Sequence, residues 1–163
     1  MTDPLRVGVA GFGNVARHFH VPAHQSLHNR FEIVAHADLT SDRLDAEPVA
    51  SGLGAARVHS EAQARHRRHD ADLVDPCTPQ HRHRDPIVGA TRAGRRTACE
   101  KPQAADQANA AAAVDAVERT TMHPGVVHNY LSFPESVTAG RLIDPSAGWV
   151  APTQASAVLG GAP

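Results

Sequence analysis

The sequence has 163 residues, which suits one domain of ordinary size with a small appendage. Its formal net charge of −1 excludes the strong positive field of a protein that binds nucleic acid or an anionic membrane. No stretch approaches the ~20 consecutive apolar residues of a membrane span, and the polar residues 1–4 do not open a signal peptide. We therefore expect a cytoplasmic protein.

The hydrophobic core should be thin. Alanine makes up 29 of the 67 hydrophobic residues, and Val, Ile, Leu and Phe together number 32 of 163. That share is near the limit of ~20% below which a highly charged chain tends to be disordered. Because the net charge is low and the apolar residues are periodic, we expect a fold of marginal stability. The 12 histidines predict solubility that depends on pH.

Few residues suggest a metal or a disulfide. Cys77 and Cys99 lie in strand-like segments, where two buried free thiols in a reducing compartment are expected. His66 and His69 have metal-ligand spacing, but no carboxylate or thiol obviously joins them, so no metal site is expected. The short basic cluster at 65–68 has no interleaved aromatics, which disfavours nucleic-acid binding.

The first element is a strand that runs into a glycine-rich turn and a helix. Residues 5–16 read LRVGVAGFGNVA, which contains the G-x-G-x-x-G/A pattern of a dinucleotide-binding turn. Gly11 allows a tight turn, Gly13 lets a pyrophosphate approach the backbone, and Ala16 lets helix and strand pack closely. The phosphates would sit at the helix N-terminus. The alternative is a tight turn without a ligand.

The second strand is expected at 31–38 and ends in a carboxylate. Asp38 stands 22 residues after Ala16, where a dinucleotide fold places the group that binds the adenosine ribose diol. A negative charge there would repel a 2′-phosphate, which favours NAD over NADP. Arg43, which is close in the sequence, makes this preference less certain. The alternative role for Asp38 is a helix or turn cap.

Other elements follow in alternation. Helix one should run over 14–27 with Val15, Phe19 and Leu27 as its apolar points and with Pro22 ending or kinking it early. A helix over 41–54, a strand over 54–58 and a solvated helix over 61–69 come next. Strand four begins at 73, and Pro76 must end it early or distort it, because proline removes a ladder donor.

The second half continues the pattern. We expect a helix over 81–93 closed by Gly94, a strand over 95–99, and an alanine-rich helix over 104–120 with Val114 and Val117 on one face. A strand over 125–130 and a helix over 134–143 follow, and the pattern fades from 144 onward. Such alternation predicts an α/β fold of Rossmann type, a doubly wound parallel sheet.

Polar residues recur where the expected strands end. Ligands of open parallel sheets bind at the carboxyl ends of the strands, so these residues should converge on one crevice. They are the turn at Gly11, Asp38, Thr78-Pro79, Glu100-Lys101 and Asn129.

Five motifs in order make a resemblance recognisable. GFGNVA, AHADL, CTPQHRH, CEKP and HNYLSFPE resemble the Gfo/Idh/MocA oxidoreductases over about residues 5–150. The resemblance implies a nicotinamide-dinucleotide domain followed by a substrate domain, and oxidation of a secondary hydroxyl of a sugar or polyol, or the reverse. It further implies which residues contact the cofactor. They are Gly11, Phe12, Gly13, Asn14 and Val15 at the pyrophosphate, Asp38 at the ribose, Thr78, Pro79, His81 and His83 near the nicotinamide, and Glu100 beside it, with Asn129 included among the cofactor-binding residues.

Lys101 is the residue on which we expect the chemistry to depend. Hydride transfer requires the substrate hydroxyl to lose its proton, and a lysine in a partly dry crevice can hold that hydroxyl and relay the proton. Glu100 could orient Lys101. The alternative for Glu100-Lys101-Pro102 is a surface turn with an ion pair. The sequence departs from the family at Gln80, where asparagine is usual, and at Arg82, where an apolar residue is usual.

We expect the chain to hold the N-terminal part of such an enzyme. Residues 1–122 would form the dinucleotide-binding core, 123–145 the last strand and crossover helix, and 146–163 an irregular start of the substrate domain. The family's second domain, with its further acid/base pair, would lie beyond position 163. The alternative is a non-catalytic dinucleotide-binding or interaction module, which could pair with a partner chain or a second copy at its C-terminal end.

Overall fold

The computed structural model describes residues 3–39, 57–60, 71–120, 122 and 124–143. The chain divides into two units, residues 1–127 and residues 128–163, and each is described by itself. The helices expected at 41–54 and 61–69, the segment 146–163, and Arg43, His66 and His69 lie outside the described residues.

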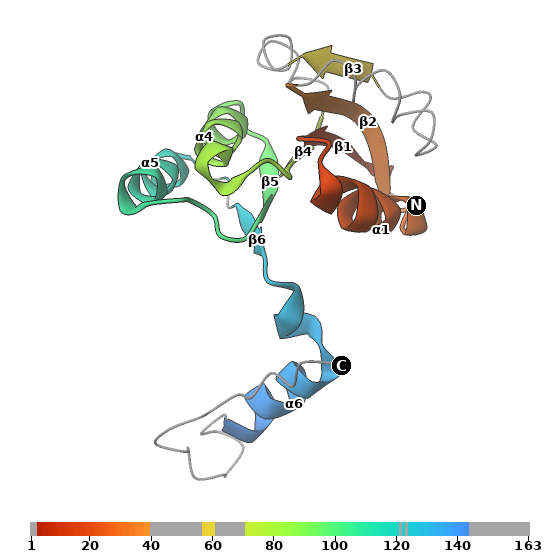
Figure 1. The fold of residues 1–163 in the computed structure, drawn as a ribbon, viewed down its shortest axis with the longest axis vertical. Coiled ribbons are helices and arrows are strands. Elements are labelled where there is room, and N and C mark those ends of the chain that lie inside the picture. Colours follow the sequence, from red (N-terminus) through yellow and green to blue (C-terminus); the bar gives the residue numbers. More distant parts are fainter. Residues whose placement is uncertain (1–2, 40–56, 61–70, 121, 123, 144–163) are drawn as a thin grey trace. The chain divides into compact units, whose positions relative to one another are not determined.

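The first unit is built on a six-stranded parallel sheet in the order β3-β2-β1-β4-β5-β6 (Figure 1). This is the strand order of the Rossmann fold, and it confirms the α/β prediction. The strands are β1 (Leu5–Ala10), β2 (Phe31–Asp38), β3 (Arg57–Ser60), β4 (Leu73–Pro76), β5 (Arg96–Glu100) and β6 (Gly125–Val127).

Pro76 ends β4 early, as its missing N–H predicts. The strand lies between β1 and β5, yet only Leu73 and Val74 pair with β5. On the other side the pairing with β1 continues to Pro76, which is opposite Ala10. The chain leaves the sheet directly afterwards, and the N–H of Cys77 donates to the carbonyl of Ala10 at 2.8 Å.

The first helix continues through Pro22, which was expected to end or kink it. It begins at Asn14, passes through a π-helical turn, η1 (Ala16–His20), and continues as α1 (Val21–Ser26), so Pro22 does not end it. The Val21 N–H donates to Ala16 O across this wider turn. The irregular turn therefore lies directly before the proline, which has no N–H to donate. The expectation that Val15, Phe19 and Leu27 form the apolar face was wrong, because all three side chains are exposed.

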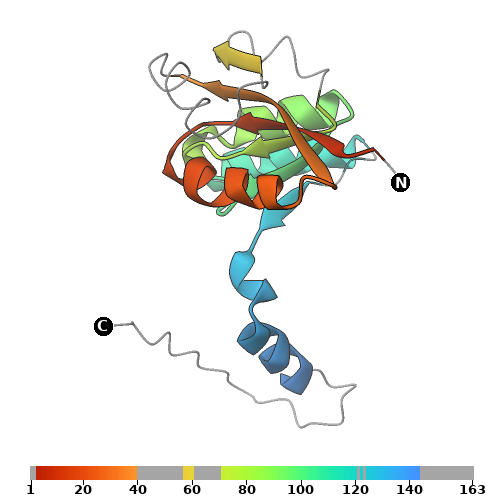
Figure 2. The same cartoon turned by 90° about the vertical axis from the view of Figure 1, so that its right-hand side faces the viewer.

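Helices α4 and α5 lie on the face of the sheet opposite α1 (Figures 1 and 2). A 3₁₀ turn, η3 (Gln80–Arg82), leads into α4 (Arg84–Arg92), and Gly94 at φ 68° follows its end. Helix α5 (Gln107–Glu118) begins at the N-cap Asp106. Its buried side chains are Ala113 and Ala116, while Val114 is exposed, so alanine rather than valine forms its inner face.

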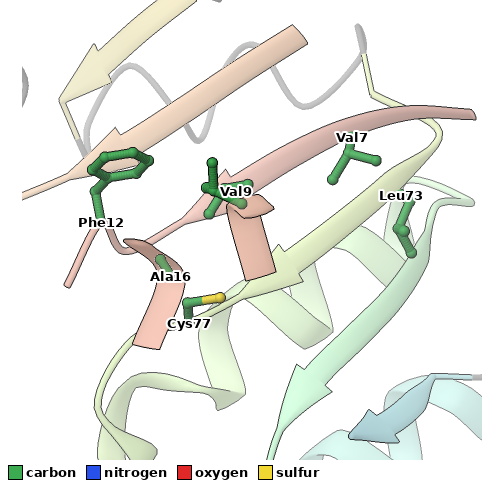
Figure 3. Close-up of a cluster of buried hydrophobic side chains, with 7 residues drawn as sticks. Val7, Val9, Phe12, Ala16, Leu73 and Cys77 are labelled. Atoms are coloured by element: carbon green, nitrogen blue, oxygen red, sulfur yellow. The ribbon is translucent and has the colours of Figure 1, made fainter. Parts of the chain in front are cut away.

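The two faces bury different amounts of apolar side chain. The cluster on the α1 face lies between β1, β4 and the first helix (Figure 3). It consists of Val7, Val9, Phe12, Ala16, Val21, Leu73 and Cys77. The cluster beside α4 and α5 contains three residues, Ile87, Cys99 and Ala113. Both cysteines are free and buried, as expected.

The second unit is described over two short elements. A 3₁₀ turn, η4 (Asn129–Ser132), is followed by α6 (Pro134–Ile143). The rings of Tyr130 and Phe133 meet edge to face, with centroids 5.3 Å apart. Strand β6 ends at Val127, so the expected strand over 125–130 is shorter and Asn129 begins a turn instead. None of the helices described in either unit has the length and apolar character to cross a membrane.

Candidate functional site

The turn after β1 requires glycine at one position and leaves space at another. Gly11 has φ 90°, and a Cβ on it would lie 2.9 Å from both the Cγ2 and the backbone nitrogen of Thr78. The turn therefore fits tightly against the loop after β4. At Gly13 a Cβ would meet no atom within 4 Å. The backbone at Gly13 is thus open to a group that approaches from outside.

Asp38 reaches this turn from the end of β2. Its Oδ2 accepts a hydrogen bond from the backbone N–H of Phe12 at 2.7 Å. The neighbouring Gly11 N–H donates to the carbonyl of Ala37 at 2.7 Å. The carboxylate is therefore held beside the glycine turn, although the two segments are 26 residues apart.

His83 joins the loop after β4 to the loop after β5. Its ring is 1% exposed. Its Nε2 lies 2.5 Å from the carbonyl oxygen of Thr78, and its Nδ1 lies 2.9 Å from that of Pro102. A neutral imidazole can donate to one of these carbonyls at a time. The side chain thus orders the Glu100-Lys101-Pro102 segment from within the protein.

The remaining predicted residues differ in their surroundings. The hydroxyl of Thr78 is buried and has no hydrogen-bond partner among the described residues. Pro79, His81 and Lys101 are exposed. Glu100 Oε2 accepts the backbone N–H of Lys101 at 3.1 Å.

The carboxyl ends of β1, β2, β4 and β5 therefore bring most of the predicted residues together. Asn14 and Val15 are exposed at the start of the first helix. Asn129 belongs to the second unit, where its Oδ1 accepts the backbone N–H of Tyr130 at 3.1 Å. Its role at the cofactor stays a prediction.

A buried polar cluster joins the first helix to β4 and β5, and the sequence reasoning missed it. Asp75 is 1% exposed, and its Oδ2 lies 2.9 Å from His20 Nδ1 and 2.8 Å from His24 Nε2. The other nitrogen of His20 lies 3.2 Å from Glu100 Oε1. The available signals were the spacing of two histidines by one helical turn and an aspartate inside an apolar strand.

Burial and hydrogen bonding act against each other in this cluster. Burial raises the pKa of Asp75, but the hydrogen bonds and charges of His20 and His24 outweigh it, and the net pKa is lowered. Burial lowers the pKa of His20, but Asp75 and Glu100 outweigh it, and the net pKa is raised. The Asp75 carboxylate is therefore kept ionised in spite of its burial.

The two thiols are made unreactive by the same surroundings. Burial, with the Asp75 carboxylate as the next cause, raises the pKa of Cys77 far above its ordinary value. Burial, again followed by Asp75, raises the pKa of Cys99 to about 12. Because the thiolate is the nucleophilic form, neither cysteine suits nucleophilic catalysis.

A family model supports the assignment that this geometry suggests. Residues 5–128 match the model of the Gfo/Idh/MocA oxidoreductases, described as an oxidoreductase family with an NAD-binding Rossmann fold. The chain belongs to this family. The match covers the whole sheet, from β1 to β6.

Individual members agree with the family match. The chain is 34% identical to the D-glucoside 3-dehydrogenase of Escherichia coli over 103 residues, which are 63% of this chain and 28% of that protein. It is 35% identical to the D-apiose dehydrogenase of Paraburkholderia graminis over 112 residues, 69% of this chain and 29% of that protein.

A solved structure agrees in fold. The WlbA dehydrogenase of Bordetella pertussis, crystallised with NADH and UDP-GlcNAcA, superposes with a TM-score of 0.74 at 25% identity. The superposition covers 87% of this chain and 42% of that one. The chain thus spans less than half the length of these Gfo/Idh/MocA relatives.

Proposed function

We propose that the first unit binds a nicotinamide dinucleotide along the edge formed by the glycine turn, Asp38 and Thr78. The observation that carries this proposal is the contact between the Asp38 carboxylate and the Phe12 N–H, which puts a ribose-binding group beside the turn. The open backbone at Gly13 suits a pyrophosphate, and the unpartnered Thr78 hydroxyl suits a polar ligand. The residues present therefore fit the cofactor of the Gfo/Idh/MocA family.

The same carboxylate favours NAD over NADP. An ionised Asp38 can accept hydrogen bonds from the two hydroxyls of an adenosine ribose. A ribose 2′-phosphate placed there would meet a like charge beside it.

We assign the proton chemistry to Lys101, with Glu100 as a positioning residue. The nicotinamide, when bound, exchanges a hydride with a carbon of the substrate. Lys101 is exposed at the end of β5, where its side chain can hold a secondary hydroxyl, accept the hydroxyl proton as the neutral amine and return it as the ammonium. Glu100 accepts the Lys101 backbone N–H, and His83 holds Pro102, so the segment is ordered on both sides of the lysine.

The proposed substrate class is a sugar or polyol with a secondary hydroxyl. The relatives that support it are dehydrogenases named for D-glucosides and D-apiose. In a whole enzyme of the Gfo/Idh/MocA family, a substrate domain would complete the pocket. It would follow the dinucleotide-binding core at 1–122 and the last strand and crossover helix at 123–145, and its first part would be residues 146–163.

Titration calorimetry with NADH tests cofactor binding. Asp38→Ala should weaken binding about 10- to 100-fold, as expected for lost hydrogen bonds to a charged group. It should also narrow the preference for NADH over NADPH. The matched control is Asp115→Ala, an exposed carboxylate on α5 that should leave the affinity unchanged. A folded wild-type chain that binds neither nucleotide would show that the glycine turn is architectural.

A second measurement separates a dehydrogenase from a binding module. NAD reduction by a panel of polyols is followed by absorbance in the wild-type chain and in Lys101→Ala. A signal that Lys101→Ala abolishes, with unchanged NADH affinity, supports hydride transfer. Equal rates in the two proteins would remove Lys101 from the chemistry.

A further inference from the structure

Three ligand-type atoms from the first helix and β4 meet inside the first unit. His20 Nδ1, His24 Nε2 and Asp75 Oδ2 all lie within 4.8 Å of one another. The two histidines are four residues apart on one helix and face the same oxygen of the strand residue. Two imidazoles one helical turn apart, joined by a carboxylate, form a ligand set found in metal sites.

Each end of this set also has an outer partner. The second nitrogen of His20 lies 3.2 Å from Glu100 Oε1, which forms a carboxylate–histidine pair behind the inner nitrogen. The second oxygen of Asp75 accepts from Cys77 Sγ at 3.5 Å. Metal-binding histidines usually donate their other N–H to a carboxylate or carbonyl, and metal-binding carboxylates are usually hydrogen-bonded in turn. The cluster has both features.

We propose that His20, His24 and Asp75 bind one divalent transition-metal ion of the Zn²⁺ and Co²⁺ class. Two nitrogens and one carboxylate oxygen suit this class, and a three-ligand set leaves a position open for water or another ligand. Glu100 would act from outside, through His20. None of the three ligands is among the residues proposed to bind the dinucleotide, so metal binding can be tested in the absence of the cofactor.

Small side-chain movements convert the cluster into a metal site. The nitrogen–oxygen distances of 2.8 and 2.9 Å are those of hydrogen bonds. Metal bonds of about 2.0–2.1 Å in a tetrahedral arrangement place neighbouring ligand atoms about 3.3 Å apart. For the ion to bind, the ring nitrogen of each imidazole that faces Asp75 must be unprotonated, so its proton moves to the other ring nitrogen or, from an imidazolium, to water. His20 and His24 retain 10% and 14% side-chain exposure, which gives the ion a route in.

Cobalt binding to the purified, EDTA-treated and dialysed chain tests the proposal. Co²⁺ gives visible absorption bands whose intensity reports a low-coordinate site. We expect about one equivalent to bind with such bands, and Zn²⁺ to displace it. His24→Gln should weaken this binding by at least about 100-fold, because it removes a direct ligand, and Glu100→Gln by about 10- to 100-fold.

Matched variants exclude general binding by the other histidines. His18→Gln removes an exposed imidazole two residues from His20 and should leave the titration unchanged. Asp75→Asn serves as a second ligand variant, with circular dichroism to check that it folds. If His24→Gln and His18→Gln bind Co²⁺ as the wild type does, the cluster is a hydrogen-bonded ion-pair network and the proposal is wrong. Absence of any intense band in the wild type would overturn it equally.

Discussion

The two faces of the sheet in the first unit are held together differently. The α1 face combines a cluster of seven buried residues with the ionised Asp75 and its two histidines. The face covered by α4 and α5 has a cluster of three, in which Ile87 is the largest side chain and Ala113 the inner contact of α5. Among the described residues, the α1 face therefore has the larger apolar cluster and the buried charge, while the opposite face has the smaller apolar cluster.

The largest effect should come from removing the main apolar side chain of the weaker face. Ile87 is fully buried, so Ile87→Ala should lower the free energy of unfolding by about 2–5 kcal/mol. Urea denaturation measures it. Val114→Ala on α5 is the control, because that valine is exposed and should change stability by less than about 0.5 kcal/mol. If Ile87→Ala lowers the free energy of unfolding by less than about 1 kcal/mol, the Ile87 side chain is not a main source of stability for this face.

On the α1 face, the corresponding test is a substitution in the buried polar cluster rather than in the apolar core. Asp75→Asn keeps the shape of the side chain but removes the charge that both histidines face. The free energy of unfolding should fall by about 1.5–3 kcal/mol, as for hydrogen bonds to a charged group. The measurement is made in EDTA, so that no bound ion contributes. Unchanged stability would mean that the cluster contributes nothing to holding this face.

Removing a buried hydroxyl from the face covered by α4 and α5 should not destabilise the protein, in contrast to the change at Asp75. Thr97 is 4% exposed, and its Oγ1 has no hydrogen-bond partner among the described residues. Thr97→Val should leave stability unchanged or raise it by up to about 1 kcal/mol. The matched control is Thr120→Val, whose hydroxyl bonds to Val117 O and Met122 N, and which should be destabilising. Equal losses in the two variants would contradict this difference.

The smallest effect concerns the cap of α5. Asp106 accepts the Asn109 backbone N–H at 2.8 Å, and chiefly this bond lowers the pKa of Asp106. A lowered pKa means that the cap stabilises the fold above about pH 4 and that this stabilisation is lost as the pH falls through the folded-state value. Asp106→Ala should therefore lower the urea midpoint slightly near neutral pH, and the difference from wild type should shrink in acid. Asp106→Asn, which also caps, should retain the midpoint. A pH-independent difference would contradict the role of the carboxylate.

Most of the sheet could be predicted from the sequence because its signals are local. The alternation of apolar strands with helices, the glycine spacing after β1 and the carboxylate at the end of β2 each lie within a short stretch. Pro76 predicted the early end of β4 for the same reason, since a missing N–H acts where it stands. The convergence of Asp38 and Thr78 on Gly11 followed from the rule that parallel strands share one ligand-binding edge.

The errors arose where a neighbouring element decides which side chain faces inward. The sequence by itself determined the family, the parallel sheet and the position of the glycine turn, because these depend on backbone conformation and residue order. Only the tertiary structure decided that a π turn exposes Phe19 while His20 and His24 face the sheet. It also decided that Asp75 meets them, since helix and strand lie more than 50 residues apart and their contact depends on packing.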